Sequence, residues 1–348
     1  MTNSAAPASA PTATRRGLLA HPEDIHCVVF DLVLKVSYLA AFAIWLKWDA
    51  IPALAATATA GKVFFGLGAA LMLGWCNGIN VGVNFHNHAH RKVFTKPWLN
   101  SWFGRFWTIS GGWPAYLWQH SHVVVHHVHL LHEQDWTIMR RKADGTFENI
   151  YKYSILHWPW RYVRGLIKDV QTGRYGPIGT RMAAEAAFFF VVFAIPFVVD
   201  WRMGLMLWLL PAFLGNAMVM GPGMYAQHVD CVPKSKEKPY THSNTFVNSF
   251  FNFTMFNIGY HIEHHDHPMV HWSDLPGLHA QMKNDMVAAG SHIVPYGYYR
   301  SGQLLCQATF SDRAAAAWKI QHPDYLRPTP AATSSAAVET SGRTVAVP

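Results

Sequence analysis

Long apolar stretches alternate along the chain with polar stretches rich in histidine. Four apolar stretches come near the roughly 20 residues that a helix needs to cross a bilayer. They occupy residues 28–47, 62–84, 182–200 and 203–226. The link between the last two, Asp200-Trp201-Arg202, is so short that they are expected to form an antiparallel hairpin. The pattern predicts an all-α membrane protein with about four transmembrane helices.

Three further apolar stretches do not fit a crossing. Residues 96–118 are aromatic but broken by Gly and Pro, which predicts a re-entrant or interfacial segment. Residues 150–172 alternate aromatic and basic side chains, as in an amphipathic helix on a membrane surface. Residues 246–260 are apolar but too short to cross. We expect one membrane domain over residues 21–325, between disordered tails at 1–20 and 326–348.

The composition and charge fit a membrane protein. Hydrophobic residues make up 51% of the chain and charged residues only 14%, against roughly 25% charged residues in soluble proteins. With this composition, the net charge of +8 indicates contact with anionic lipid and not with nucleic acid. Asp31 and Lys35 lie one helical turn apart near the start of the first span, and we expect them to pair at the membrane interface.

The distribution of basic residues predicts the orientation. If the N-terminus is cytoplasmic, the second and fourth spans both end on the cytoplasmic side. Most Arg and Lys residues between the spans then lie on that side, whereas the link between the third and fourth spans holds only Arg202. Both termini and the polar segments that follow the spans are therefore expected to be cytoplasmic, with these segments forming a helical cap.

The histidines form three clusters after the apolar stretches. On a helix, residues four apart share one face, so His86 and His90 project together, while His88 points away. The same spacing pairs His122 with His126. His127 lies about 140° around the helix from His122 and could serve a second metal, and His129 is an alternative ligand. The third cluster comprises His261, His264 and His265.

The predicted topology brings these clusters to one face of the membrane, together with His228 at the end of the fourth span. Nine imidazoles exceed the needs of one metal but suit two metals with four or five ligands each. Imidazole binds zinc, copper, iron and nickel, so the residues alone do not choose the metal. The four cysteines have no C-x-x-C spacing, which argues against an iron–sulfur cluster or a zinc ribbon. A histidine-rich metal transporter is an alternative, but it should carry ionisable groups near mid-span.

The three clusters read H-x3-H, H-x3-H-H and H-x2-H-H, and over residues 28–290 this order resembles the membrane fatty acid desaturase and hydroxylase superfamily. The run from Asn257 to Pro268 is similar to the N-x-G-Y-H-x-E-H-H-D-x-P run of sphingolipid desaturases. Carotenoid ketolases carry a similar segment followed by Trp and Leu-Pro, which Trp272 and Leu275-Pro276 match. The subfamily therefore stays open.

The resemblance implies a centre of two non-haem iron ions that activates O2 and attacks an unactivated C–H bond. The implied reaction is desaturation of a long acyl or sphingoid chain that enters from the bilayer, and hydroxylation or ketolation is the alternative within the superfamily. The implied electron source is an external ferredoxin or cytochrome on the basic face. Four residues are expected to orient the ligand imidazoles: Asp135, Asn257, Glu263 and Asp266.

Overall fold

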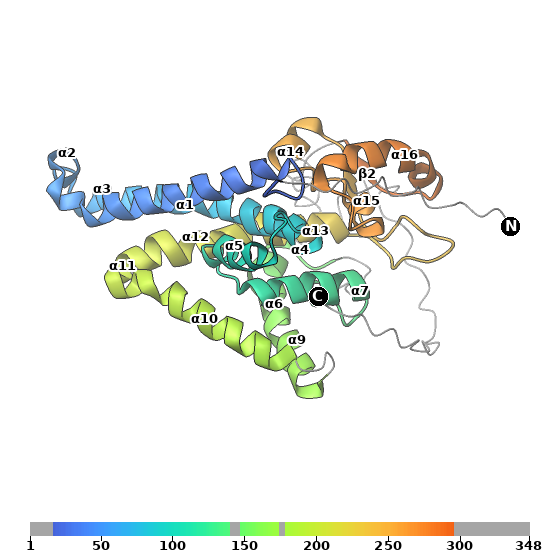
Figure 1. Ribbon diagram of the computed structural model, residues 1–348, viewed down its shortest axis with the longest axis horizontal. Coiled ribbons are helices and arrows are strands. Elements are labelled where there is room, and N and C mark those ends of the chain that lie inside the picture. Colours follow the sequence, from blue (N-terminus) through green and yellow to red (C-terminus); the bar gives the residue numbers. More distant parts are fainter. Residues whose placement is uncertain (1–16, 140–146, 174–177, 296–348) are drawn as a thin grey trace.

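Four long apolar helices form the body of the molecule (Figure 1). The computed structural model describes residues 17–139, 147–173 and 178–295, and the statements below concern these residues. The helices long and apolar enough to cross a membrane confirm the four expected spans, and they cover Asp24–Leu46, Thr59–His90, Arg181–Val199 and Trp201–His228. The first is α1 (Asp24–Leu46), and the third lies within α10 (Ile178–Val199).

The second and fourth spanning helices alternate α-helical and π-helical segments. In a π-helical segment the backbone hydrogen bonds join residues five apart, which adds a residue to the turn. The second spanning helix consists of α3 (Ala58–Ile79), η2 (Asn80–Phe85) and α4 (His86–His90). The fourth consists of α11 (Trp201–Gly204), η5 (Leu205–Leu209), α12 (Leu210–Gly215), η6 (Asn216–Met220) and α13 (Gly221–His228).

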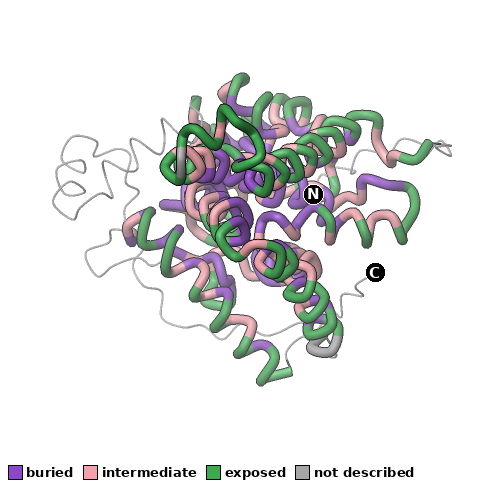
Figure 2. The backbone as a smooth tube through the Cα atoms, turned by 90° about the vertical axis from the view of Figure 1, so that its left-hand side faces the viewer, coloured by how far each residue is buried: buried purple, intermediate pink, exposed green. Residues whose placement is uncertain are grey.

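Glycines let α3 and α12 pack closely. A Cβ atom added to Gly215 would lie 2.8 Å from the carbonyl oxygen of Gly74 and 2.9 Å from the amide nitrogen of Gly78. No side chain fits there, so the two backbones touch, as at small-residue contacts between membrane helices. The outward faces of the spanning helices carry exposed apolar side chains such as Phe64, Phe190 and Val198. Figure 2 marks the buried, intermediate and exposed residues along the backbone, with exposed residues along the outer sides of the helices.

Asp31 and Lys35 lie inside the bundle, which corrects the expectation of a pair at the membrane interface. The Lys35 ammonium lies 2.8 Å from Asp31 Oδ1 and 3.0 Å from Ser110 Oγ. The Asn80 side chain donates to the same Asp31 oxygen over 2.7 Å. Because Asp31 is fully buried, this network ties α1 to the second spanning helix through charge and hydrogen bonds.

Shorter helices surround the histidine-rich end of the bundle. Residues 96–118 form two helices separated by a turn in which Gly112 has a φ of +78°. Residues 150–172 are helical as expected, and Trp160, Val163 and Ile167 form an exposed apolar stripe on them. Their placement on a membrane surface stays a prediction. These helices are α5 (Pro97–Ile109), α6 (Ala115–Gln119), η3 (His120–His126), α7 (His127–His129), α8 (Ile150–Lys152), η4 (Tyr153–His157) and α9 (Trp158–Thr172).

The C-terminal part of the described chain covers the same end of the bundle. Helix α14 (Ser249–Thr254) is too short to cross a membrane and exposes Phe250 and Phe253. A two-residue parallel pairing joins β1 (Thr245–Phe246) to β2 (Ile293–Val294). The remaining elements are α15 (His261–Asp266), η7 (Trp272–Asp274) and α16 (Leu275–Ala288), and at the opposite end of the bundle η1 (Trp48–Ala50) and α2 (Pro52–Ala55).

Candidate metal centre

Each histidine cluster lies on a helix that ends at the same end of the bundle. The second spanning helix, from Thr59 to His90, is roughly 48 Å long at 1.5 Å per residue, whereas a bilayer core measures about 30 Å. The helix is therefore longer than such a core, and its last turns, which follow the apolar residues, carry His86 and His90. The fourth spanning helix ends at His228 and places that imidazole beside the others.

The π-helical geometry of η3 decides how the second cluster divides. In a regular α-helix His122 would pair with His126. Here the Nε2 atoms of His122 and His127, five residues apart, lie 3.2 Å from each other. His126 turns toward His228 and His265 instead, with ring centroids 4.8 and 5.1 Å away. This corrects the expected pairing of His122 with His126.

Helix α15 lies between the two sets of imidazoles. The turn before it places Phe256 and Asn257 at φ values of 46° and 59°, which brings the chain sharply into the site. His264 Nε2 then lies 2.8 Å from His86 Nε2 and 3.3 Å from His127 Nε2. His261 Nε2 lies 3.2 Å from the Nε2 atoms of both His228 and His265. One short helix therefore contributes to both sets.

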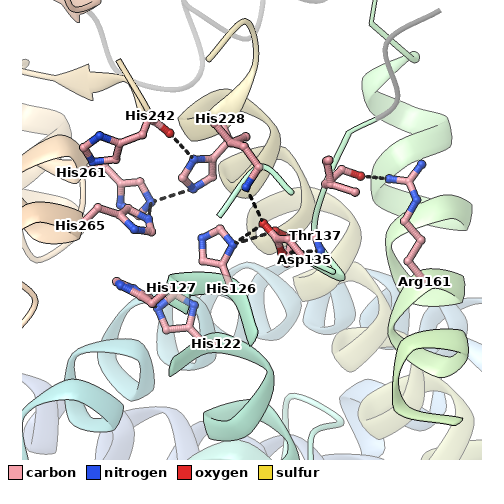
Figure 3. Close-up of polar contacts among 12 residues, drawn as sticks. His122, His126, His127, Asp135, Thr137, Arg161, His228, His242, His261 and His265 are labelled. Carbon is pink, nitrogen blue, oxygen red and sulfur yellow. Dashed lines mark hydrogen bonds and ion pairs between the residues drawn. The ribbon is translucent and has the colours of Figure 1, made fainter. Parts of the chain in front are cut away.

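The nine imidazoles form two adjoining groups. We name them the first group, which consists of His86, His90, His122, His127 and His264, and the second group, which consists of His126, His228, His261 and His265. Three members of the second group, and all five of the first, have ligand atoms within 4.8 Å of one another. Figure 3 shows the second group with His122 and His127 beside it. His129 belongs to neither group.

The donor atoms fit metal ions. Two nitrogens bound to one ion at about 2.1 Å lie roughly 3.0–3.4 Å apart for bond angles between about 90° and 109°. The facing Nε2 atoms are 2.8 to 3.3 Å apart, close to that range. The Nε2 atoms of His90 and His126 are buried and have no hydrogen-bond partner. Since a buried polar atom without a partner is costly, a cation at each group would satisfy these nitrogens.

The other ring nitrogens explain why some Nε2 atoms face the centre. His126 Nδ1 lies 3.0 Å from Asp135 Oδ2 and 2.9 Å from Thr137 Oγ1, so the buried Asp135 orients this ring. His228 Nδ1 donates to the carbonyl oxygen of His242 over 3.3 Å. Figure 3 shows both contacts. Such partners fix the tautomer and the direction of a ligand imidazole. Nothing in the local spacing marks Thr137 and His242, so their roles do not follow from the sequence.

The other three residues expected to orient imidazoles have different contacts. The Asn257 side chain donates to the carbonyl oxygen of Trp272 over 3.1 Å. Glu263 bonds Thr245 and His279, and Asp266 pairs with Lys234. These contacts hold α15 and its flanking loops in place. They correct the expected contacts with ligand imidazoles, which only Asp135 makes.

The electrostatic environment keeps the imidazoles of α15 neutral. Burial lowers the pKa of His264 to about 3, and the nearby His126 adds to the shift. Burial also lowers the pKa values of His261 and His265 well below the usual range, and repulsion between neighbouring rings adds to it. His122 and His127 follow the same pattern. Neutral imidazole is the form that binds metals, so the site is prepared for cations at physiological pH.

An apolar cavity of about 40 Å³ reaches the first group from inside the bundle. His86 and His122 line one side of it, and Trp118 packs on His122 with ring centroids 4.9 Å apart. Most of the remaining lining is apolar and includes Val83, Trp158, Val219, Met220, Met224 and Ile258. The arrangement can hold a hydrocarbon segment against the imidazole group and keep water away from it.

A family model supplies the remaining observation. The model for fatty acid desaturases matches residues 61–297, a range that contains all nine imidazoles. The chain belongs to the fatty acid desaturase family. As a member of the family, it is an integral membrane oxidoreductase of the desaturase and hydroxylase type that acts on lipid. The family's use of iron agrees with two groups of imidazoles that could hold metal ions. Searches of curated proteins and of solved structures gave no match.

Proposed function

We propose that the protein is an O2-dependent di-iron desaturase that introduces a double bond into a long acyl or sphingoid chain of a membrane lipid. The observation that carries this proposal is the junction between the first group of imidazoles and the apolar cavity. A hydrocarbon in that cavity lies directly against His86 and His122. A reaction at an unactivated C–H bond needs the lipid chain beside the metal centre, and this cavity supplies an apolar space there.

The nine imidazoles would hold the two iron ions, the first group one and the second group the other. Bound iron would supply the reduction of O2 that a reaction at an unactivated C–H bond requires. The protein's own contribution is orientation. Asp135 and the His242 carbonyl hold rings of the second group, and α15 fixes three imidazoles across both groups.

The cavity positions the substrate. Trp118 stacks on His122 and forms the wall nearest to the imidazoles. Trp107 is fully buried and packs against His88, and Trp113 packs against Trp158, so neither of them lines the cavity. Of the three tryptophans Trp107, Trp113 and Trp118, the last is therefore the one that lines the cavity.

The proposal places both termini and the metal centre on the cytoplasmic side, following the distribution of basic residues. Lys234, Lys236 and Lys238 are exposed on the loop after α13, and Lys234 pairs with Asp266 next to His265. An acidic one-electron carrier of the ferredoxin or cytochrome type would dock on this basic loop, because opposite charges steer such encounters.

Expression in a host whose membrane lipids are profiled by mass spectrometry tests the reaction. Desaturation predicts lipids that have lost two hydrogens, whereas lipids that have gained one oxygen atom would show a hydroxylase of the same family. Metal analysis of the purified protein tests the centre, with two irons per chain expected. Zinc in place of iron, or far less than two irons in an active preparation, would contradict the di-iron assignment.

A further inference from the structure

A second cavity also reaches the first group, and its lining differs from that of the apolar cavity. It is lined by His90 and His264, together with Asp24, Asn87 and His271. The cavity measures about 10 Å³, which is close to the space that one water occupies. The first group therefore lines the apolar cavity through His86 and His122, and this second cavity through His90 and His264. We call the second one the polar cavity because of its charged and polar residues, although it is also lined by Pro268, Val270, Trp272 and Leu275.

A chain of hydrogen bonds connects this polar cavity to the surface. Asp24 Oδ1 accepts from His271 Nε2 over 3.0 Å, and His271 Nδ1 lies 2.7 Å from Ser273 Oγ. Ser273 Oγ lies 3.4 Å from Asp274 Oδ1, and Asp274 is exposed. Asp24 and His271 are themselves buried, with 3% and 2% of their surface exposed. The chain of bonds thus runs from solvent to the cavity without a gap.

The side chains in this series of hydrogen bonds are of the kinds that transfer protons. A buried carboxylate–imidazole pair is costly to desolvate, and apolar residues would join the start of α1 to the loop after α15 at least as well. Each member of the chain can both accept and release a proton. Asp24 and His271 lie 247 residues apart in sequence and meet only at the cavity wall.

We propose that Asp274, Ser273, His271 and Asp24 form a proton relay into the polar cavity beside His90 and His264. The proposal rests on the proposed function, because desaturation consumes one O2, two protons, and two electrons from the one-electron carrier. With the two hydrogens of the substrate, these give two waters and the double bond. The relay supplies the two protons from the cytoplasmic side, apart from the hydrocarbon.

Each transfer conserves atoms and charge along the chain. The Ser273 O–H bond breaks as an N–H bond forms at His271 Nδ1, and the Nε2–H bond breaks as an O–H bond forms on Asp24. Asp24 then releases that proton to water in the cavity, and Asp274, after taking a proton from solvent at the surface, passes it to Ser273. The transfer leaves His271 with its proton on Nδ1, so the next proton follows once proton exchange with water has returned the ring to its Nε2–H form. These four residues are positioning and transfer groups, and none of them belongs to either imidazole group.

Two further titratable or charged groups face the relay. His21 stacks on His271 with ring centroids 3.7 Å apart, and its backbone N–H donates to Asp24 Oδ2 over 3.1 Å. Arg91 lines the polar cavity. Ligand atoms of His21, His271 and Asp274 lie within 4.8 Å of one another, so a change at His21 would disturb the relay.

The test measures proton uptake, not turnover. An electron that enters a buried centre adds a charge that low-dielectric surroundings disfavour, so reduction draws in protons. The full-length iron-loaded protein is reduced electrochemically through a mediator without O2, and a pH-indicator dye follows the uptake. We expect Asp24→Asn and His271→Gln to slow uptake at least about tenfold, in line with the contribution of a positioned proton-transfer group. His26→Ala, a change at an exposed histidine of α1, is the control and should behave like the unmodified protein.

Iron content and melting temperature are measured for each variant. If Asp24→Asn or His271→Gln loses iron, its slower uptake has another cause. Ser273→Ala then tests the relay, because it interrupts the relay near the surface and leaves the buried pair intact. Unchanged uptake in a variant that holds iron would overturn the relay, as would reduction of the unmodified protein without proton uptake. Failure of the proposed function looks different, since the unmodified protein would then hold no iron or form no oxidised lipid.

Discussion

The bundle buries polar side chains at two places, around Asp31 and Lys35 between the spanning helices and in the histidine centre at their end. At the first place the chain supplies both partners, since Lys35 and Asn80 meet the same oxygen of Asp31. At the second, like groups face one another, as His86 and His264 do. The protein neutralises the carboxylate of the first cluster by itself, although Asp31 Oδ2 and Asn80 Oδ1 have no hydrogen-bond partner, whereas the second cluster holds only like groups, which cations would satisfy. The first should therefore behave as a structural joint and the second as a binding site.

Removing a central ligand should have the largest effect. His264 faces both His86 and His127, so His264→Ala should abolish product formation and lower the iron content. Lipid profiling and metal analysis measure both quantities. His26→Ala is the control, because His26 is exposed and pairs only with Glu23 at the surface. Full product formation by His264→Ala would refute the assignment of this ligand.

Breaking the Asp31–Lys35 pair should lower the stability of the protein and leave its metal content unchanged. Lys35→Met leaves a buried carboxylate without its cation, which should cost about 3–5 kcal/mol of unfolding free energy. The double change Asp31→Leu and Lys35→Met should recover most of that loss, because no charge then stays buried. Denaturation in detergent measures the stability. A single variant as stable as the unmodified protein would mean that the pair is not a structural joint.

Removing the metal should loosen only the histidine centre. A ligand present at a hundred times its dissociation constant stabilises a protein by about 2.7 kcal/mol, so chelation should lower the melting temperature. Hydrogen exchange should rise in 120–129 and 261–266, where the imidazoles lose their shared partner. Residues around Asn80 and Asp31 should exchange as before. Equal loosening of both regions would contradict the distinction between them.

We expect the smallest effect from changing a residue that contacts a proposed metal ligand but does not itself bind metal. Asp135 holds His126 through Nδ1, and loss of such a partner typically weakens metal binding by about 10–100-fold. Asp135→Asn should therefore reduce affinity at the second group while the first group keeps its metal. Titration with metal into the metal-free protein measures the two affinities. Equal losses at both groups would show that Asp135 acts on the whole fold.

Much of the fold follows from local pattern, because crossing a bilayer imposes length and composition on each span. The apolar pattern does not predict the end of a helix that continues past its apolar residues. Apolar residues after position 62 run only to about 84, yet the helix continues to His90 because packing holds its last turns. The three clusters could likewise be found from spacing, since helical faces repeat regularly.

Grouping within the site could not be predicted in the same way. Dividing His122, His126 and His127 correctly requires the π-helical turn, and no residue type in that stretch marks it. Contacts between distant segments pose a second obstacle. Asp31 meets Asn80 because two helices pack side by side, and Asp24 meets His271 because the loop after α15 packs on the start of α1. A single sequence carries no signal of such pairs.

The glycine contact between α3 and α12 has a mechanical consequence. Gly74 lies 12 residues before His86 and Gly215 lies 13 before His228, which corresponds to arms of roughly 18 and 20 Å along the helices. The distance between the two imidazole groups therefore depends on how closely the two helices approach each other at this crossing. A single methyl group at position 215 would push the two backbones apart and increase the distance between the helix ends that carry His86 and His228. The size of the residue at position 215 thus influences the separation of the two imidazole groups.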